Sequence, residues 1–196
     1  MVKSAKPAHE PDGRRRRSQD SRARIVAAML ELVGEGALIP GAEQVAERAQ
    51  VGLRTVFRHF NDMDSLYREI SHAIETELRK VIARPFKAPP GPGRILELVE
   101  RRAPAYEQIA PVRRAADAQR HGSPFLAAQH TRLVAEGREI IRRELPPALA
   151  ADPSRLEMLD LLLSYETWDR LRREQGLSAK RAREVLEAAV RRTLES

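Results

Sequence analysis

The chain has 196 residues, enough for one large or two small domains with a sizeable hydrophobic core. It contains no cysteine, which excludes disulfides, a thiolate nucleophile and zinc–sulfur sites. The formal net charge of +7 suits a polyanionic partner.

Membrane and export signals are missing from the sequence pattern. No apolar run approaches the roughly 18 residues that a membrane span requires. The N-terminus also lacks the apolar stretch of a signal peptide. We therefore expect a soluble, cytoplasmic protein with no membrane partner.

Residues 1–17 contain Pro7, Pro11 and Gly13 but almost no large apolar group, which predicts a disordered basic arm. The arm ends in four consecutive arginines, including Arg17. Such a run is either a solvated tail or, beside a DNA-binding motif, an arm that reaches phosphates or the minor groove. Ser18 or Asp20 is expected to cap a first helix that ends near Val33, and its buried stripe is Ile25, Met29, Leu32 and Val33.

Residues 43–60 predict two short helices joined by a tight turn. The first helix has an apolar face made by Val45, Ala46 and Ala49. The turn contains Gln50, Val51 and Gly52, with Gly52 at the N-cap of the second helix. The second helix has an apolar face made by Thr55, Val56, Phe57 and Phe60, and it leaves Leu53, Arg54 and Arg58 pointing outward. This pattern is that of a helix-turn-helix, whose second helix can lie in the DNA major groove; an ordinary helical hairpin is the alternative.

The rest of the chain is also expected to be helical. A long helix over residues 64–83 is followed by a Pro- and Gly-rich connection at residues 85–93. Later helices are expected over residues 94–102, 123–145, 153–175 and 178–194, with Pro104 and Pro111 breaking or kinking the stretch between the first two. No strand pattern is visible, so the sequence predicts an all-α protein.

The last two helices are apolar over more than one face, which is typical of helices buried on several sides. Part of this surface must be core. Because a chain of this size offers limited cover for both helices, we expect the remainder to mediate self-association. The dimer-interface residues expected on these helices are Leu159, Leu163, Leu186 and Val190.

The helix-turn-helix and its flanks resemble the DNA-binding domain of the TetR family of bacterial transcriptional regulators. The resemblance covers residues 21–67 and depends on matched positions at fixed spacing: Val45, Ala46, Ala49, Val51, Thr55, Val56, Phe57, Arg58, His59, Phe60, Asp64, Leu66 and Tyr67. The sequence departs from the family at three positions. Gln50 stands where Gly is frequent, Gly52 where a capping Ser is frequent, and Met63 where a phosphate-binding Lys is usual.

This resemblance implies a DNA-binding domain over residues 18–67, followed by a helical effector-binding and dimerisation domain over residues 68–196. The expected partners are a double-stranded operator, a second copy of the chain and an unknown small-molecule effector, and the chain is expected to act as a repressor. Four C-terminal helices, two from each subunit, would form the dimer interface. The expected DNA contacts are Arg17, Gln44, Leu53, Arg54, Thr55, Phe57, Arg58 and His59. Leu53 and Arg54 would read base edges, while Thr55, Phe57 and His59 would meet the backbone.

An effector cavity is expected among the Pro-containing helices, because kinked helices pack imperfectly. A largely hydrophobic ligand is expected, with a histidine or arginine orienting its polar end. Each candidate lining residue can equally be plain core. The candidates are Tyr106, Ile109, His121, Phe125, His130, Tyr165 and Trp168.

Two other interpretations remain open. Glu69 and His72 stand three residues apart, as in metal sites of helical bundles, but a second such pair is not visible. The second alternative is a DNA-binding protein that acts architecturally, without an effector. No motif of a hydrolase, nucleotide-binding protein or dehydrogenase is visible, so we expect no enzyme activity and no cofactor.

Overall fold

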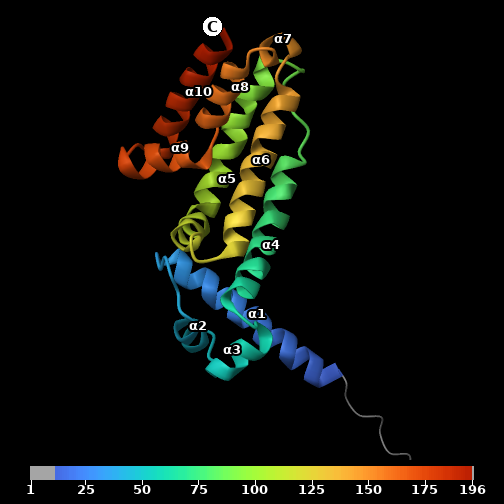
Figure 1. Cartoon of the computed structure of the whole chain (residues 1–196), viewed down its shortest axis with the longest axis vertical. Helices are drawn as coiled ribbons and strands as arrows, with labels where there is room; N and C mark the ends of the chain where they lie inside the picture. Colours follow the sequence, from blue (N-terminus) through green and yellow to red (C-terminus); the bar gives the residue numbers. More distant parts are fainter. Residues whose placement is uncertain (1–11, 196) are drawn as a thin grey trace, which may run out of the picture. The chain divides into compact units, whose positions relative to one another are not determined.

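The computed structural model describes residues 12–195, and every regular element within them is helical (Figure 1). The all-α prediction is therefore confirmed. The chain divides into two compact units, one ending at Ile70 and the other beginning at Ser71. Each unit has its own hydrophobic core and is described separately.

Unit 1 contains α1 (Asp12–Gly34), α2 (Ala42–Arg48), α3 (Leu53–His59) and the first turns of α4 (Met63–Ile82). α1 packs against both α2 and α3, which also pack against each other. Buried apolar side chains from all four helices meet in one core: Ile25, Ala28, Met29, Val33, Val45, Ala46, Ala49, Val56, Phe60, Leu66, Tyr67 and Ile70.

Two details of unit 1 differ from the prediction. α1 begins at Asp12, so residues 12–17 are helical rather than part of a disordered arm. Arginine is a good helix former, and Arg17 donates from Nε to the carbonyl of Gly13 one turn earlier, 3.1 Å away. The expected arm at residues 1–11 lies outside the described residues. Phe57, expected on the apolar face of α3, is instead 47% exposed because Val56 and Phe60 fill the core beneath it.

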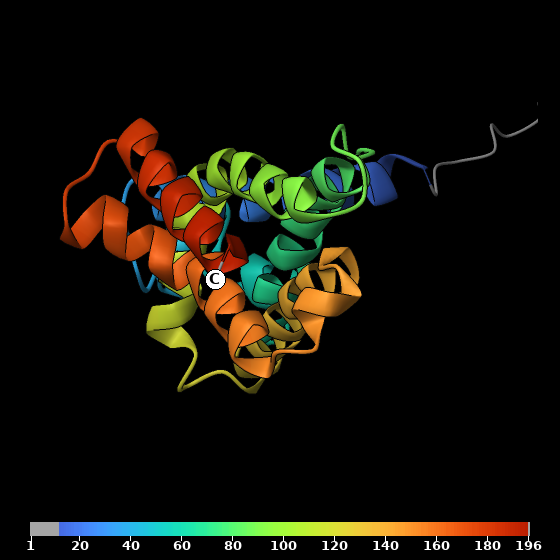
Figure 2. The same ribbon diagram turned by 90° about the horizontal axis from the view of Figure 1, so that it is seen from above.

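Unit 2 contains the rest of α4 and six further α-helices. Their bounds are α5 (Pro92–Gln119), α6 (Pro124–Glu144), α7 (Pro147–Ala150), α8 (Pro153–Leu162), α9 (Tyr165–Asp169) and α10 (Ala179–Glu195), with a π-helical turn at Arg170–Glu174. α10 packs against both α5 and α8, and the three helices lie side by side in both views (Figures 1 and 2). α6 packs against α5 and α8. No helix in residues 12–195 is long and apolar enough to cross a membrane.

α5 is a single helix that contains both Pro104 and Pro111, contrary to the expected break. Each proline removes one backbone hydrogen bond, a cost that tertiary packing can override. Buried side chains fix the helix before Pro104, at Leu98, Val99 and Ala103, and Ala115 is buried after Pro111. Figure 1 shows a continuous ribbon whose last turns change direction.

The opposite deviation occurs at residues 153–175, where one helix was expected. α8 ends at Leu162, and Ser164 starts α9 by accepting the backbone N–H of Thr167 on its Oγ, at 3.1 Å. A serine with a free backbone N–H three residues ahead favours a new N-cap over continued helix. As a result, the backbone carbonyl of Leu163 is left without a helical partner.

The prediction that four residues of the last helices lie at a dimer interface is wrong, because these residues are buried within the single chain. Leu159, Leu163, Leu186 and Val190 are all buried inside unit 2, in one cluster with Trp168, Ile95 and Ile141. α5 and α6 pack against the helices that carry these four side chains, and the sequence alone could not predict this packing. The exposed apolar side chains of α8 are instead Met158 and Leu161.

Candidate functional site

The front of α3 is the first candidate site, and it is formed by exposed side chains over a rigid core. Gly52 caps the helix, and Leu53, Arg54, Phe57 and Arg58 are exposed. Thr55 is half-buried. A short helix carrying arginines and apolar side chains on its open face can offer both guanine and thymine contacts to a DNA groove.

The end of α3 is held by Arg22 of α1. The Arg22 guanidinium lies 4.4 Å from the centre of the Phe60 ring and donates from Nη1 to the carbonyl of His59 at 2.8 Å. It also pairs with Glu69 of α4 at 3.0 Å. One side chain therefore connects three helices of unit 1 and fixes the direction of α3.

His59 is half-buried, and its Nε2 atom is buried without a hydrogen-bond partner. Burial lowers the pKa of His59, and the charges of Arg58 and Arg22 lower it further. The ring is therefore neutral near pH 7. Such a group can take up a proton when a phosphate approaches it.

The turn between α2 and α3 contains a conformational outlier. Gln50 has φ of +53°, in the left-handed region that glycine adopts most readily, and Gln50 stands where TetR-like sequences often have glycine. Two other predicted DNA contacts have local roles. Gln44 accepts the N–H of Gly41 on Oε1 at 2.9 Å and so caps α2, while Arg17 is exposed on α1.

The first turn of α4 is closed by reciprocal bonds between Asp62 and Ser65. The N–H of Ser65 donates to Asp62 Oδ1 at 2.7 Å, and the Asp62 N–H donates to Ser65 Oγ at 3.4 Å. Met63 is the first residue of the helix and is half-buried, so this position presents no positive charge.

Unit 2 contains the second candidate site, a cavity of about 310 Å³. This volume lies at the lower end of the range for small-molecule sites. Apolar side chains make most of the wall, and four arginines and three carboxylates line it as well. The lining residues are Leu78, Phe86, Leu98, Arg101, Arg102, Ala105, Tyr106, Ile109, Arg113, Leu133, Val134, Glu136, Gly137, Ile140, Arg143, Asp160, Ser164, Tyr165 and Glu166.

The break between α8 and α9 organises one wall of the cavity. The carbonyl of Leu163 accepts two hydrogen bonds, from Arg102 Nη1 at 2.7 Å and from the Tyr106 hydroxyl at 2.6 Å. Arg102 Nη2 also donates to the carbonyl of Gly137 at 3.0 Å. Burial raises the pKa of Tyr106, with the positive charge of Arg102 acting in the opposite direction. The interrupted helix thereby positions a cation and a phenol side by side.

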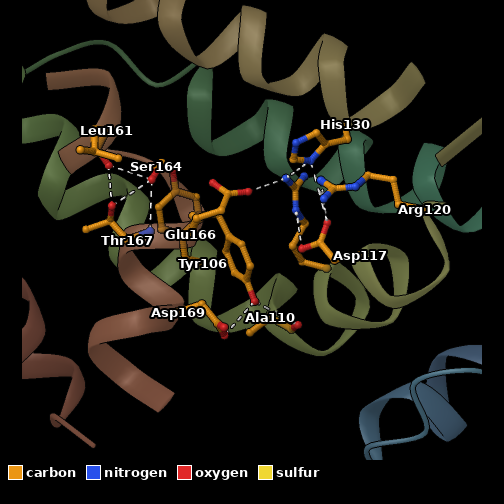
Figure 3. Close-up of polar contacts among 12 residues, drawn as sticks. Tyr106, Ala110, Asp117, Arg120, His130, Leu161, Ser164, Glu166, Thr167 and Asp169 are labelled. Carbon is orange, nitrogen blue, oxygen red and sulfur yellow. Dashed lines mark hydrogen bonds and ion pairs between the residues drawn. The ribbon is translucent and has the colours of Figure 1, made fainter. Parts of the chain in front are cut away.

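A charged cluster lies at another part of the wall, around Arg113. Arg113 Nη2 contacts His130 Nδ1 at 2.7 Å and Glu166 Oε1 at 3.0 Å. Figure 3 labels His130, Glu166 and Asp117 in this cluster. Its Nε is buried without a hydrogen bond, although Asp117 Oδ2 lies 3.5 Å away. Burial lowers the pKa of His130, and the Arg113 and Arg120 charges lower it further, so the ring is neutral and accepts from Arg113.

The predicted cavity residues fall into three groups. Tyr106, Ile109 and Tyr165 line the cavity, and the Tyr106 and Tyr165 rings meet edge to face with centroids 5.6 Å apart. His130 reaches the cavity only through Arg113. The remaining three residues are outside the lining: Trp168 is core and donates from Nε1 to Glu107 at 2.8 Å, His121 is exposed, and Phe125 is half-buried on α6.

Arg102 and Arg113 line the cavity but were not among the residues predicted for it. The signal available was their spacing on α5, because Arg102, Tyr106, Ile109 and Arg113 recur every three or four residues and so share one face. The alternative metal site is not assembled around Glu69, because its carboxylate is engaged by Arg22. Within residues 12–195, no group of three or more His, Asp or Glu side chains has a geometry that could hold a metal ion.

Comparison with known proteins gives a match in structure only. No protein-family model and no curated protein matches the chain. The fold resembles the crystal structure of a transcriptional regulator from Rhodococcus sp. Rha1, with a TM-score of 0.63. The two sequences are 18% identical, and the similarity covers 89% of this chain and 96% of the other. At this level of identity the likeness shows a shared fold.

Proposed function

We propose that this chain is a DNA-binding transcriptional regulator of the TetR type and that α3 is its recognition helix. The observation that carries the proposal is the exposed face of α3, with Leu53 and Arg54 at its front, on a helix fixed by Arg22. The positive charge of the chain and its structural likeness to a transcriptional regulator support the same function. This proposal assigns the chain a regulatory rather than an enzymatic role, in the cytoplasm.

The regulator would act as a homodimer on an inverted-repeat operator, with the two heads on half-sites one helical turn apart, about 34–36 Å. Met158 and Leu161 of α8 support self-association, because they are large, apolar and exposed. The dimer interface would therefore be formed by the outer face of α8, and not by the buried residues Leu159, Leu163, Leu186 and Val190.

The chain would act as a repressor that releases its operator when a small molecule occupies the cavity in unit 2. α4 is one continuous helix from Met63 to Ile82, and its Leu78 lines the cavity. A ligand that contacts Leu78 can bias α4, provided that it binds the DNA-incompetent state more tightly. The coupling would be reciprocal, so operator DNA would weaken ligand binding by the same factor.

The test is selection of bound duplexes from a random library, followed by affinity measurements on variants. Arg54→Ala should cost about 1–3 kcal/mol and weaken discrimination at one base position in each half-site. Arg24→Ala is the matched control, because Arg24 is also an exposed arginine of unit 1 but lies on α1. Absence of an enriched sequence in the selection, or an equal loss for Arg54→Ala on specific and random duplex, would contradict the assigned role of α3.

A further inference from the structure

The cavity has a chemical preference that follows from its charges. We infer, building on the proposed ligand-controlled function, that it binds a small apolar molecule carrying one carboxylate, and that Arg102 binds this carboxylate. The inference depends on the balance of charge around the wall and on the free donors of one guanidinium.

Most charges that line the cavity are already paired. Among the carboxylates, Glu136 pairs with Arg132 at 3.0 Å, Asp160 with Arg138 at 3.6 Å, and Glu166 with Arg113 at 3.0 Å. Among the arginines, Arg101 pairs with Glu97 at 2.6 Å. A neighbouring arginine therefore partly neutralises each of the three carboxylates, which weakens the attraction of this wall for a cationic ligand.

Arg102 differs from these residues. Within the part of the chain that the structure describes, no carboxylate forms an ion pair with it. Its two hydrogen bonds go to the carbonyls of Leu163 and Gly137, which orient the guanidinium but carry no net charge. A guanidinium has five N–H donors, so Arg102 retains donors for a ligand beyond these two bonds and its contact with the Tyr106 hydroxyl.

The surroundings of Arg102 strengthen its interaction with a bound anion. Arg102 is partly buried, and apolar side chains such as Leu98, Ile109 and Ile140 line the same cavity. Water is scarce beside such a wall, so a charge-assisted bond is stronger than at the surface. The aliphatic or aromatic body of the ligand would gain from contact with the apolar wall.

Arg143 also lines the cavity and has no carboxylate partner among the described residues, but its side chain is exposed. Water and salt screen an exposed cation, so it contributes little to the selection of a ligand. Arg102 is consequently the residue that determines the preference, and Arg143 is its matched control.

The first experiment uses the wild-type full-length chain and isothermal titration calorimetry. The probes are octanoate, octanamide and octylamine, which share one apolar tail and differ in the charge of the head, with 4-phenylbutyrate and its amide as an aromatic pair. Each carboxylate should bind at least about tenfold more tightly than its amide, and octylamine should bind most weakly. Equal affinity for the carboxylate and the amide in both pairs overturns the inference.

The second experiment assigns the preference to a residue. Arg102→Gln should remove most of the carboxylate preference while retaining weak binding of the amide, and Arg102→Lys should retain part of it. Arg143→Gln should leave the preference unchanged. Loss of the preference in Arg143→Gln but not in Arg102→Gln overturns the assignment. If Arg102→Gln fails to fold because two backbone carbonyls lose their donor, Arg102→Lys and the wild-type probe series still decide the question.

A third measurement separates this inference from the proposed function. Operator release is followed with the same probes at saturating concentration. Tighter binding of octanoate without operator release supports the carboxylate site and contradicts ligand control of DNA binding. Release caused equally by octanoate and octanamide supports ligand control and contradicts the charge preference.

Discussion

The candidate sites of the two units differ in where their arginines lie. In unit 1 the arginines of α3 lie on the surface, and one cation, Arg22, fixes the helix that carries them. In unit 2 Arg102 and Arg113 lie along the face of α5 that lines a cavity. The exposed face of α3 therefore suits contact with a large partner, whereas the cavity in unit 2 suits a small enclosed ligand.

The largest expected effect distinguishes core from surface in unit 2. Val190→Glu places a charge at a position that is 0% exposed, and we expect a loss of about 5 kcal/mol or more, enough to unfold unit 2. Leu161→Glu, at a position 66% exposed in the single chain, should leave unit 2 folded, and any fall in melting temperature should be no larger than the loss of the proposed dimer explains. Thermal melts followed by circular dichroism make the comparison. A Val190→Glu protein that melts like the wild type would place this residue at a surface after all.

Sedimentation of the same Leu161→Glu protein addresses the proposed dimer. A folded monomer at a concentration where the wild type is a dimer would support the outer face of α8 as the interface. A dimer that persists in Leu161→Glu would point to another surface.

The second prediction makes the same distinction within unit 1, using two phenylalanines of one helix end. Phe60 is 1% exposed and lies beneath Arg22, so Phe60→Ala should cost about 3–5 kcal/mol. Phe57 is 47% exposed, so Phe57→Ala should change stability by no more than about 0.5 kcal/mol and act mainly on DNA affinity. Urea unfolding and duplex binding of both variants test this. A destabilised Phe57→Ala protein would show that its ring packs in the core.

The difference between the units also explains what the sequence could predict. In unit 1 the helices α2 and α3 are short and each has one buried face, so periodicity identified Val45, Val56 and Phe60 as core. Phe57 was misassigned, because residue type alone does not distinguish an exposed aromatic side chain from a buried one.

In unit 2, periodicity could not decide what covers an apolar helix. Leu159 and Val190 were expected at a dimer interface, yet α5 and α6 of the same chain bury them. The prolines of α5 predicted an interruption that packing overrides, whereas the actual interruption at Ser164 is marked only by a serine. Of the residues expected around a cavity, Tyr106, Ile109 and Tyr165 lie in the lining of the cavity in unit 2. Arg102 was not predicted there, because its position depends on the Leu163 carbonyl, which the break between α8 and α9 leaves without a helical partner.

The third prediction concerns the left-handed backbone conformation at one turn position of each unit. Gln50 in unit 1 has φ of +53°, and Gly176 in unit 2 has φ of +67°. A side chain in this region costs about 1 kcal/mol relative to glycine. Gln50→Gly should therefore stabilise the protein by about 1 kcal/mol, and Gly176→Ala should destabilise it by a similar amount. Denaturant midpoints measure both changes. A destabilised Gln50→Gly protein would mean that the Gln50 side chain contributes more than its backbone costs.

The smallest expected effect concerns the start of α3. Gly52 caps α3 with an extended backbone and no side-chain hydrogen bond, whereas Ser164 caps α9 with its hydroxyl. A Cβ added at Gly52 meets no atom within 4 Å, so a serine fits there without displacement.

Gly52→Ser should stabilise unit 1 by a few tenths of a kcal/mol, because a serine hydroxyl can accept a free N–H of the first turn. Gly52→Ala is the matched control, since it adds the same Cβ without the hydroxyl and should be less stable than the serine variant by about 1 kcal/mol. Equal stability of the two variants would show that no hydroxyl bond forms. Because the cap lies directly before Leu53 and Arg54, the same two variants test whether α3 is preorganised for DNA. A cap that stabilises the first turn should slow dissociation from the operator in proportion to the gain in stability. An unchanged dissociation rate would mean that contacts with α1 and α2 already fix this turn.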